Sequence, residues 1–190
     1  MIAVVVLSAL LDRMSAVNAD LRTYTATLHA QIRLVTFPFL QTAIVGTIYR
    51  KEPDRERLVV TSGLPSLAQQ FGTLYPHIER PSLWRNDFIV SVAGEGGGVA
   101  RLRLVPRKSG NVASIVASVD ESSALVTRME WNYRNGGTAE MSQAYAEIGD
   151  DELPSSQQGH IQEPGYVADI SATVDDYHLN VPLSDELFRQ

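Results

Sequence analysis

A long alternation of polar and apolar residues constrains the fold of this chain more than any other feature. Over residues 23–36, TYTATLHAQIRLVT, apolar side chains recur at every second position. Successive side chains of a strand point to opposite faces, so this period predicts a strand with one wet face and one buried face. Typical strands have about five or six residues. A strand this long must cross a wide or strongly curved sheet.

A charged turn is predicted between the next two strands. Residues 40–50 and 56–61 alternate in the same way and flank the sequence KEPDR at residues 51–55. Proline fixes φ and an aspartate side chain bonds nearby backbone, so this composition is typical of a hairpin turn. Gly46 indicates a bend, because glycine lets a sheet coil without a side-chain clash. We expect a meander of long, twisted strands.

The alternation is lost over residues 64–85 and resumes afterwards. This segment is rich in large apolar side chains and contains three prolines, a combination that predicts short helices and loops. Two interpretations are open: a segment that caps the core, or a lid over a pocket. Strands are then predicted at 87–92, 99–105, 112–119, 125–134, 138–148, 166–174 and 177–181, with a polar loop at 150–165.

The first twenty residues also allow two interpretations. An apolar run of about ten residues opens the chain and is too short to span a bilayer, which needs about twenty. It fits the remnant of an export signal, although no basic residues precede it. It also fits an amphipathic helix over residues 3–20, which we favour. The apolar residues at helical spacing are Leu7, Leu10, Leu11, Met14 and Val17.

Length and charge favour one globular domain that does not bind nucleic acid. The chain has 190 residues, enough for one sizeable core, so we treat residues 1–190 as a single domain. The formal net charge of −6 argues against a nucleic-acid partner, because phosphate binding needs clustered lysine and arginine. The chain contains no cysteine, which excludes disulfides and thiolate chemistry from it.

Two groups of residues could be imagined as metal ligands. His160 lies three residues before Glu163, and His178 follows the pair Asp175 and Asp176. Their spacing matches no known ligand frame, and the aspartate pair is typical of a turn. We predict neither a metal site nor a bound cofactor.

No catalytic residues are predicted either. No serine lies in a GxSxG motif, and no histidine position suggests a triad partner. An enzyme stays an alternative, because a site can assemble from residues far apart in the sequence. That alternative needs His29, Glu130 and Glu140 to point into a cavity.

The predicted sheet has enough apolar residues on one face to require a cover. Such a sheet closes into a barrel, pairs with a second sheet or encloses a cavity, and a filled core is an equally good interpretation. If a cavity forms, we expect apolar side chains of the strands and of the segment at 64–85 to line it. These candidate ligand-binding residues are Leu28, Ile32, Ile44, Ile48, Leu67, Phe71, Leu74, Tyr75, Trp84, Met129, Trp131, Tyr133, Met141 and Tyr145.

Four short segments carry a family resemblance: NADLRTYTATLHAQI, GTIYRKEPDRER, YRNGG and the closing YHLNVPLSDELF. In this order, with the N-terminal helix and the insert at 64–85, they resemble the LolA/LppX-like family of periplasmic lipoprotein carriers and outer-membrane lipoprotein-sorting proteins. The resemblance implies a mainly β (α+β) fold. It would be a curved antiparallel half-barrel sheet with an N-terminal helix and a short helical lid.

The resemblance also implies a function. Members of the family hold acyl chains of lipoproteins or lipids between the half-barrel and its lid, without catalysis. We therefore expect a monomeric carrier, periplasmic or otherwise extracytoplasmic, that meets transport proteins of the inner and outer membranes. The alternative is a structural or regulatory envelope protein whose half-barrel docks a protein partner.

One position departs from the family pattern. The carriers have an arginine just before the turn proline, and this arginine holds the lid through hydrogen bonds. The corresponding residue here is Glu52, with Lys51 before it. The resemblance therefore does not imply an identical latch.

Overall fold

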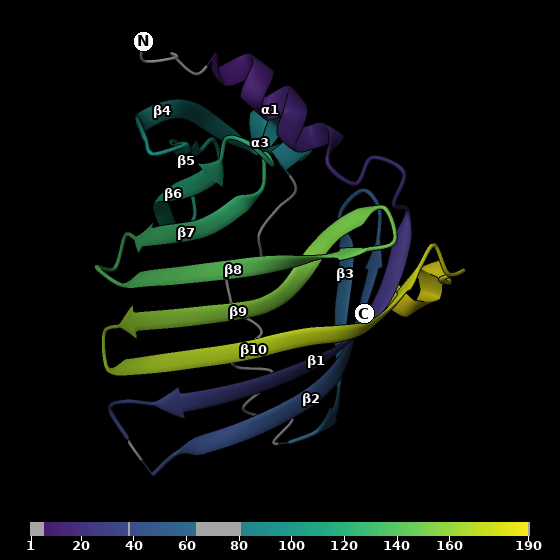
Figure 1. Ribbon diagram of the computed structural model, residues 1–190. Coiled ribbons are helices and arrows are strands. Elements are labelled where there is room, and N and C mark those ends of the chain that lie inside the picture. Colours follow the sequence, from purple (N-terminus) through teal and green to yellow (C-terminus); the bar gives the residue numbers. More distant parts are fainter. Residues whose placement is uncertain (1–5, 38, 64–80, 190) are drawn as a thin grey trace.

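The fold is built on a single curved antiparallel sheet (Figure 1). The computed structural model describes residues 6–37, 39–63 and 81–189. Within these residues ten strands form the sheet, in the order β3-β2-β1-β10-β9-β8-β7-β6-β5-β4. The strands are β1 Thr23–Leu34, β2 Gln41–Lys51, β3 Arg55–Ser62, β4 Phe88–Gly96, β5 Val99–Pro106, β6 Val112–Asp120, β7 Val126–Tyr133, β8 Thr138–Ile148, β9 Asp151–Glu163 and β10 Tyr166–Leu179.

The sheet is open, with β3 and β4 at its two edges among the strands described. Most neighbouring strands also follow each other in the sequence. The exception is β1 beside β10, which pair in antiparallel register from Tyr24 opposite Leu179 to Leu34 opposite Ala168. This one pairing joins the N-terminal meander β1–β3 to the longer meander β4–β10. The predicted mainly β half-barrel is confirmed.

Two helices cover the part of the sheet that holds β4–β7 (Figure 1). Helix α1 spans Leu7–Ala16 and confirms a helix within the predicted range 3–20, but it ends earlier than predicted, because residues 17–20 form a turn in which Asn18 has a φ of 54°. Helix α3, Pro81–Asp87, is the described part of the predicted helical insert. The Arg85 guanidinium ties the helices together, because it donates to Asp12 Oδ1 at 2.7 Å and to the Ser8 carbonyl at 2.9 Å. None of the helices in the described residues is long and apolar enough to cross a membrane.

The prediction of a polar loop at residues 150–165 is wrong, because β9 occupies most of this segment. This strand pairs with β8 on one side and with β10 on the other. Its sequence misleads because it is polar and contains Pro154 and Gly159. Pro154 sits where the β8–β9 register shifts, between Ala144 and Tyr145, and such an irregularity tolerates a residue without an amide hydrogen.

The turn predicted between two C-terminal strands is also absent, since β10 runs unbroken from Tyr166 to Leu179. Its register with β1 shifts between Thr25 and Thr27, opposite the predicted turn residues Asp175 and Asp176. Asp176 has a φ of 52°, so the extra residue is absorbed locally in the left-handed region. The aspartate pair marks a bulge within one long strand.

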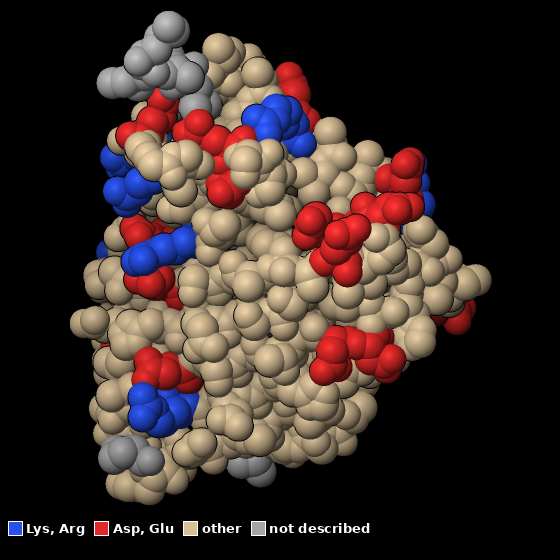
Figure 2. Space-filling model, in the orientation of Figure 1, with Lys and Arg blue, Asp and Glu red and all other residues tan. Residues whose placement is uncertain are grey.

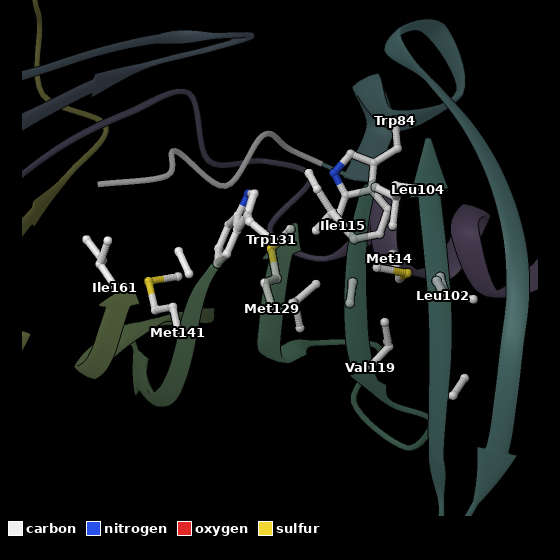
Figure 3. Close-up of a cluster of buried hydrophobic side chains, with 14 of the residues drawn as sticks. Met14, Trp84, Leu102, Leu104, Ile115, Val119, Met129, Trp131, Met141 and Ile161 are labelled. Carbon is white, nitrogen blue, oxygen red and sulfur yellow. The ribbon is translucent and has the colours of Figure 1, made fainter. Parts of the chain in front are cut away.

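Apolar side chains fill the space between the helices and β4–β7 (Figure 3). Trp84 of α3 is 1% exposed, and Leu102 and Leu104 of β5 are fully buried. Trp131 of β7 lies in the same cluster and is 2% exposed. The buried face of β7 begins at Val126, not at Leu125 as the simple alternation predicts. A register shift between Ser118 and Val119 of β6 accounts for the change.

Candidate ligand-binding pocket

An apolar pocket of about 400 Å³ lies beside the filled cluster, along the inner side of β1, β2, β8 and β10. Alternation places its lining residues on one face. Leu28, Ala30 and Ile32 follow every second position of β1, and Ile44 and Ile48 do the same on β2. Residues 170, 172 and 174 of β10 continue this surface next to β1. A ligand in the pocket would contact mainly aliphatic side chains.

Six of the predicted ligand-binding residues line this pocket: Leu28, Ile32, Ile44, Ile48, Met141 and Tyr145. Four others do not line it. Trp84, Met129 and Trp131 belong to the filled cluster, and Tyr133 packs against that cluster. The remaining four predicted residues, Leu67, Phe71, Leu74 and Tyr75, lie outside the described residues. Ligand binding is untested for all fourteen residues, and the packing of Trp84, Met129 and Trp131 argues against a direct contact of these three with a ligand.

The sequence analysis missed two small residues that leave room in the pocket. Ala30 of β1 and Ala172 of β10 are direct partners in the antiparallel register, and both line the pocket. Alanine buries little volume, so neighbouring alanines on the inner face leave a hollow that larger side chains would fill. Their alternation with the polar positions could have found them, but alanine alone does not distinguish a pocket floor from a packed core.

Arg50, a polar pocket residue, was missed as well. It lies on β2 with the same parity as Ile44 and Ile48, so the alternation indicated an inward side chain. Among the described residues it is the one charged side chain that is buried, at 7% exposure. Its Nη1 donates to Glu56 Oε2 at 2.9 Å, and its Nε lies 3.7 Å from Glu52 Oε1. This cluster forms a charged end to the apolar pocket.

The protonation of Arg50 follows from these neighbours. Burial by itself lowers the pKa of a guanidinium, but the charges of Glu56 and Glu52 and the nearby Tyr24 raise the pKa of Arg50 above its ordinary value. The arginine therefore stays cationic and paired. Glu52, just before the turn proline, lies within ion-pair distance of this cation.

Partly buried tyrosines complete the lining of the pocket. Tyr145 Oη donates to the Val126 carbonyl at 2.8 Å and accepts from Gln143 Nε2, and burial raises the pKa of Tyr145 to about 12. Tyr177 Oη donates to the Pro154 carbonyl at 2.6 Å, and burial raises its pKa as well. The Tyr177 ring meets that of Tyr24 edge to face, with centroids 5.5 Å apart. These hydroxyls are held by the protein itself.

The charged turn between β2 and β3 binds the C-terminal segment. Lys51 Nζ lies 2.5 Å from Asp185 Oδ1, and Arg55 Nη1 lies 2.6 Å from the same oxygen. Asp185 opens the 3-10 helix η1, Asp185–Phe188, which packs near β3. Hydrogen bonds from Lys51 and the charge of Arg55 lower the pKa of Asp185. The charged residues of this turn thus have a structural role: Lys51 and Arg55 hold the C-terminal segment through Asp185, and we call these three residues the clasp.

The residues that an enzyme would need lie elsewhere. His29, Glu130 and Glu140 do not line the pocket, and the exposed fractions of their side chains are 49%, 34% and 46%. His160 is half exposed, and its Nδ1 lies 2.7 Å from Asp169 Oδ1. In the described part of the chain, no group of three or more histidine or acidic side chains is placed to hold a metal ion.

Comparison with known proteins places the fold in a defined class. No family model and no curated protein matches this sequence. Solved structures do match it. A DUF1329 family protein from Desulfovibrio piger superposes with a TM-score of 0.70 at 12% identity, over 95% of each chain.

Two further structures carry a more informative description. A LolA superfamily protein from Nitrosomonas europaea has a TM-score of 0.69 at 11% identity, over 98% of this chain and 99% of that one. A Vibrio parahaemolyticus structure described as an outer membrane lipoprotein-sorting protein domain has a TM-score of 0.68 at 12% identity, over 94% and 93% of the two chains. The fold is therefore LolA-like, as the sequence resemblance implied.

Proposed function

We propose that this protein is an extracytoplasmic carrier that binds acyl chains of lipoproteins or lipids in the pocket, without catalysis. The observation that carries the proposal is an apolar pocket of about 400 Å³ on the inner side of a LolA-like sheet. Pockets of about 300–1,000 Å³ suit small organic ligands. The Vibrio structure named as a lipoprotein-sorting domain supports the assignment of the ligand class.

The polar groups in the pocket are compatible with an apolar occupant. Arg50 is paired with Glu56, Tyr145 with the Val126 carbonyl, and Tyr177 with the Pro154 carbonyl. A buried polar group is costly when it lacks a partner. Because these groups already have partners within the protein, an acyl chain can lie beside them without taking any of their hydrogen bonds.

The expected affinity suits reversible transport. Burial of one CH₂ contributes about 0.8 kcal/mol, so a chain of roughly fourteen carbons offers on the order of 10 kcal/mol before costs. Loss of rigid-body freedom and ordering of the chain offset much of that gain. A carrier that must later release its cargo to another protein or membrane needs this intermediate affinity.

The decisive experiment asks whether acyl species accompany the protein. Native mass spectrometry of protein expressed with its export route and purified without detergent should show bound lipid or acyl species. A fluorescent fatty acid should then bind in solution, and chelator and moderate salt should leave that binding unchanged, because apolar burial is barely screened. Absence of both bound lipid and probe binding would favour the alternative, an envelope protein that docks a protein partner.

A further inference from the structure

The turn between β1 and β2 presents an unusual concentration of exposed apolar side chains. Of eight large apolar residues that are strongly exposed in the described parts of the chain, four fall within six positions here. These four residues, which we call the apolar tip, are Val35, Phe37, Phe39 and Leu40, and Phe39 is 82% exposed. Isolated exposed apolar residues are ordinary, but a cluster of them on one turn indicates a contact surface.

The backbone of this turn is ordered by hydrogen bonds. The amide of Leu34 donates to the Leu40 carbonyl at 3.0 Å, and the amide of Leu40 donates to the Phe37 carbonyl at 2.8 Å. Val35 donates to the Val167 carbonyl, and Thr36 Oγ1 accepts from the Val167 amide, so the turn is also tied to β10. The fold therefore holds these side chains outward instead of letting them collapse onto the sheet.

The described residues around the apolar tip carry little unpaired charge. Arg33 is the nearest charged residue along the chain, and its Nη2 is paired with Asp169 Oδ2 at 2.6 Å. Glu163, at the end of β9, accepts a hydrogen bond from Asn135 at 2.7 Å. In Figure 2 the described atoms at the lower left, where β1 and β2 lie in Figure 1, are tan below one adjoining blue and red patch. Entry of the tip into an apolar phase would strip water from few charges.

We propose that the apolar tip inserts into the surface of a lipid bilayer. A protein partner is disfavoured by size, because a specific protein interface buries about 800 Å² on each side, far more than four side chains on a convex turn can offer. A bilayer accepts such a protrusion without a complementary surface, and hydrogen-bonded backbone limits the cost of entering it. Because the described residues place no basic cluster beside the tip, we expect this contact to be apolar and independent of anionic lipid.

The position of the tip relates it to the pocket. Ile32 and Ile44 line the pocket, and they lie three residues before Val35 and four residues after Leu40. At about 3.3 Å per residue, that end of the pocket lies roughly 10 Å from the inserted side chains. Contact with the bilayer follows from the tip alone. Delivery or collection of acyl chains there rests on the function proposed above.

The test is flotation with vesicles of phosphatidylcholine and phosphatidylethanolamine in a 3:1 ratio. The wild-type protein should float with the vesicles, in high salt as in low salt. The vesicle partition coefficient of the double variant Phe37→Ser/Phe39→Ser should fall on the order of tenfold, because the variant lacks two large apolar side chains whose transfer from water to lipid favours binding. The matched control is Ile89→Ser/Val92→Ser, which removes two exposed apolar residues of β4 and should float like the wild type.

A second measurement shows insertion directly. In the variant Phe39→Trp, the new indole should shift its emission to the blue with these vesicles and be quenched by brominated lipid. The native Trp84 and Trp131 are 1% and 2% exposed, so their emission should not change. Failure of the wild type to float, equal flotation of the double variant, or equal loss in the β4 control would overturn the proposal. The proposal would also be overturned if the wild type were a dimer that bound no vesicles and the double variant were a monomer, because the tip would then be a dimer contact.

Failure of the two proposals can be told apart. The Phe37→Ser/Phe39→Ser variant should bind the fluorescent fatty acid in solution like the wild type, because neither residue lines the pocket. If fatty-acid binding is absent while vesicle binding still depends on the tip, the carrier function fails and the bilayer contact stands. If fatty-acid binding is present and flotation is absent, the reverse holds.

Discussion

Two halves of one sheet differ in what lies against their inner faces. In the filled half, β4–β7, the helices α1 and α3 contribute Leu10, Leu11 and Trp84 to a cluster with sheet residues that are almost fully buried. In the hollow half, β1–β3 with β8–β10, the described residues leave a pocket of about 400 Å³, although Ile32, Ile44 and Met141 of this half line the pocket and also belong to the edge of the cluster. Strands in both halves, such as β1 and β5, show a period-two pattern of buried residues.

The difference shows that strand alternation specifies an inner face but not its cover. Ala117 of β6 and Ala172 of β10 are both buried alanines on inner faces. Ala117 lies in the filled cluster, whereas Ala172 lines the pocket. The local sequence of a strand does not distinguish them, because the cover comes from segments far away in the chain. Variants at matched positions can therefore separate stability from ligand binding.

The largest effect is expected for Trp131→Ala in the filled half. Trp131 is 2% exposed within the cluster, so removal of its side chain should lower the free energy of unfolding by about 3–5 kcal/mol. Urea unfolding measures the loss. Binding of a fluorescent fatty acid per folded molecule should be unchanged. Weaker binding by folded protein would mean that the pocket reaches Trp131, and the division into two halves would break down.

A sharper comparison replaces alanine by leucine in each half. Ala117→Leu should lower the free energy of unfolding by about 1–3 kcal/mol, because a close-packed core has no room for extra methyl groups. Ala172→Leu should cost less, since the side chain can enter the pocket, and should weaken fatty-acid binding on the order of tenfold. Urea unfolding and probe titration on both variants give the four numbers. Equal destabilisation with unchanged affinity in Ala172→Leu would show that the pocket is not the binding site.

Much of the fold was predictable because it depends on local pattern. The long alternation, the charged turn and the amphipathic start predicted a curved β sheet with an N-terminal helix, and the fold confirms it. β9 was missed because its residues are mostly polar and include Pro154. It is a strand because β8 and β10 supply ladder partners on both sides, and those partners are not visible in its own sequence.

The pocket was predictable only in part, for the same reason. Parity along β1 and β2 placed Leu28, Ile32, Ile44 and Ile48 on the inner face, where they line the pocket. The same rule placed Met129 and Trp131 inward, but helix packing over β4–β7 puts them in a filled cluster. Long-range packing decides between cavity and core. Arg50 had the inward parity too, but a charged residue is not expected to be buried until its partners are known.

A smaller effect is expected for Tyr145→Phe in the hollow half. Loss of the hydrogen bond to the Val126 carbonyl should lower the free energy of unfolding by about 1 kcal/mol at neutral pH. The pKa of Tyr145 is raised to about 12, so its contribution is complete below the unfolded value near 10 and is lost as pH rises toward 12. Urea unfolding from pH 8 to 11 should therefore show the gap between wild type and variant narrowing above pH 10. A constant gap would contradict the assignment.

The smallest effects compare one exposed aspartate in each half. In the filled half, Asp120 Oδ1 accepts from the amides of Ser122 and Ser123, both at 2.9 Å, and from both serine hydroxyls. These bonds, led by that of the Ser122 hydroxyl, lower the pKa of Asp120 to about 2. The carboxylate therefore stabilises the folded state above the unfolded pKa near 4, and this stability is lost as pH falls toward 2. Asp120→Asn should cost less than about 1 kcal/mol at pH 7, since the group is exposed, and the cost should vanish below pH 2.

In the hollow half, Asp185 is held instead by the charges of Lys51 and Arg55. Salt screens charge pairs at the surface more than it weakens bonds from amides and hydroxyls. Unfolding in 0.5 M sodium chloride should therefore abolish most of the effect of Asp185→Asn and leave that of Asp120→Asn. The free energies of unfolding of the wild type and the two variants, measured at pH 7 with and without salt, test this expectation. An effect of Asp185→Asn that persists in salt would show that the contacts of Asp185 do not depend on its ion pairs, and loss of the Asp120→Asn effect in salt would show that the turn between β6 and β7 is stabilised by charge as well.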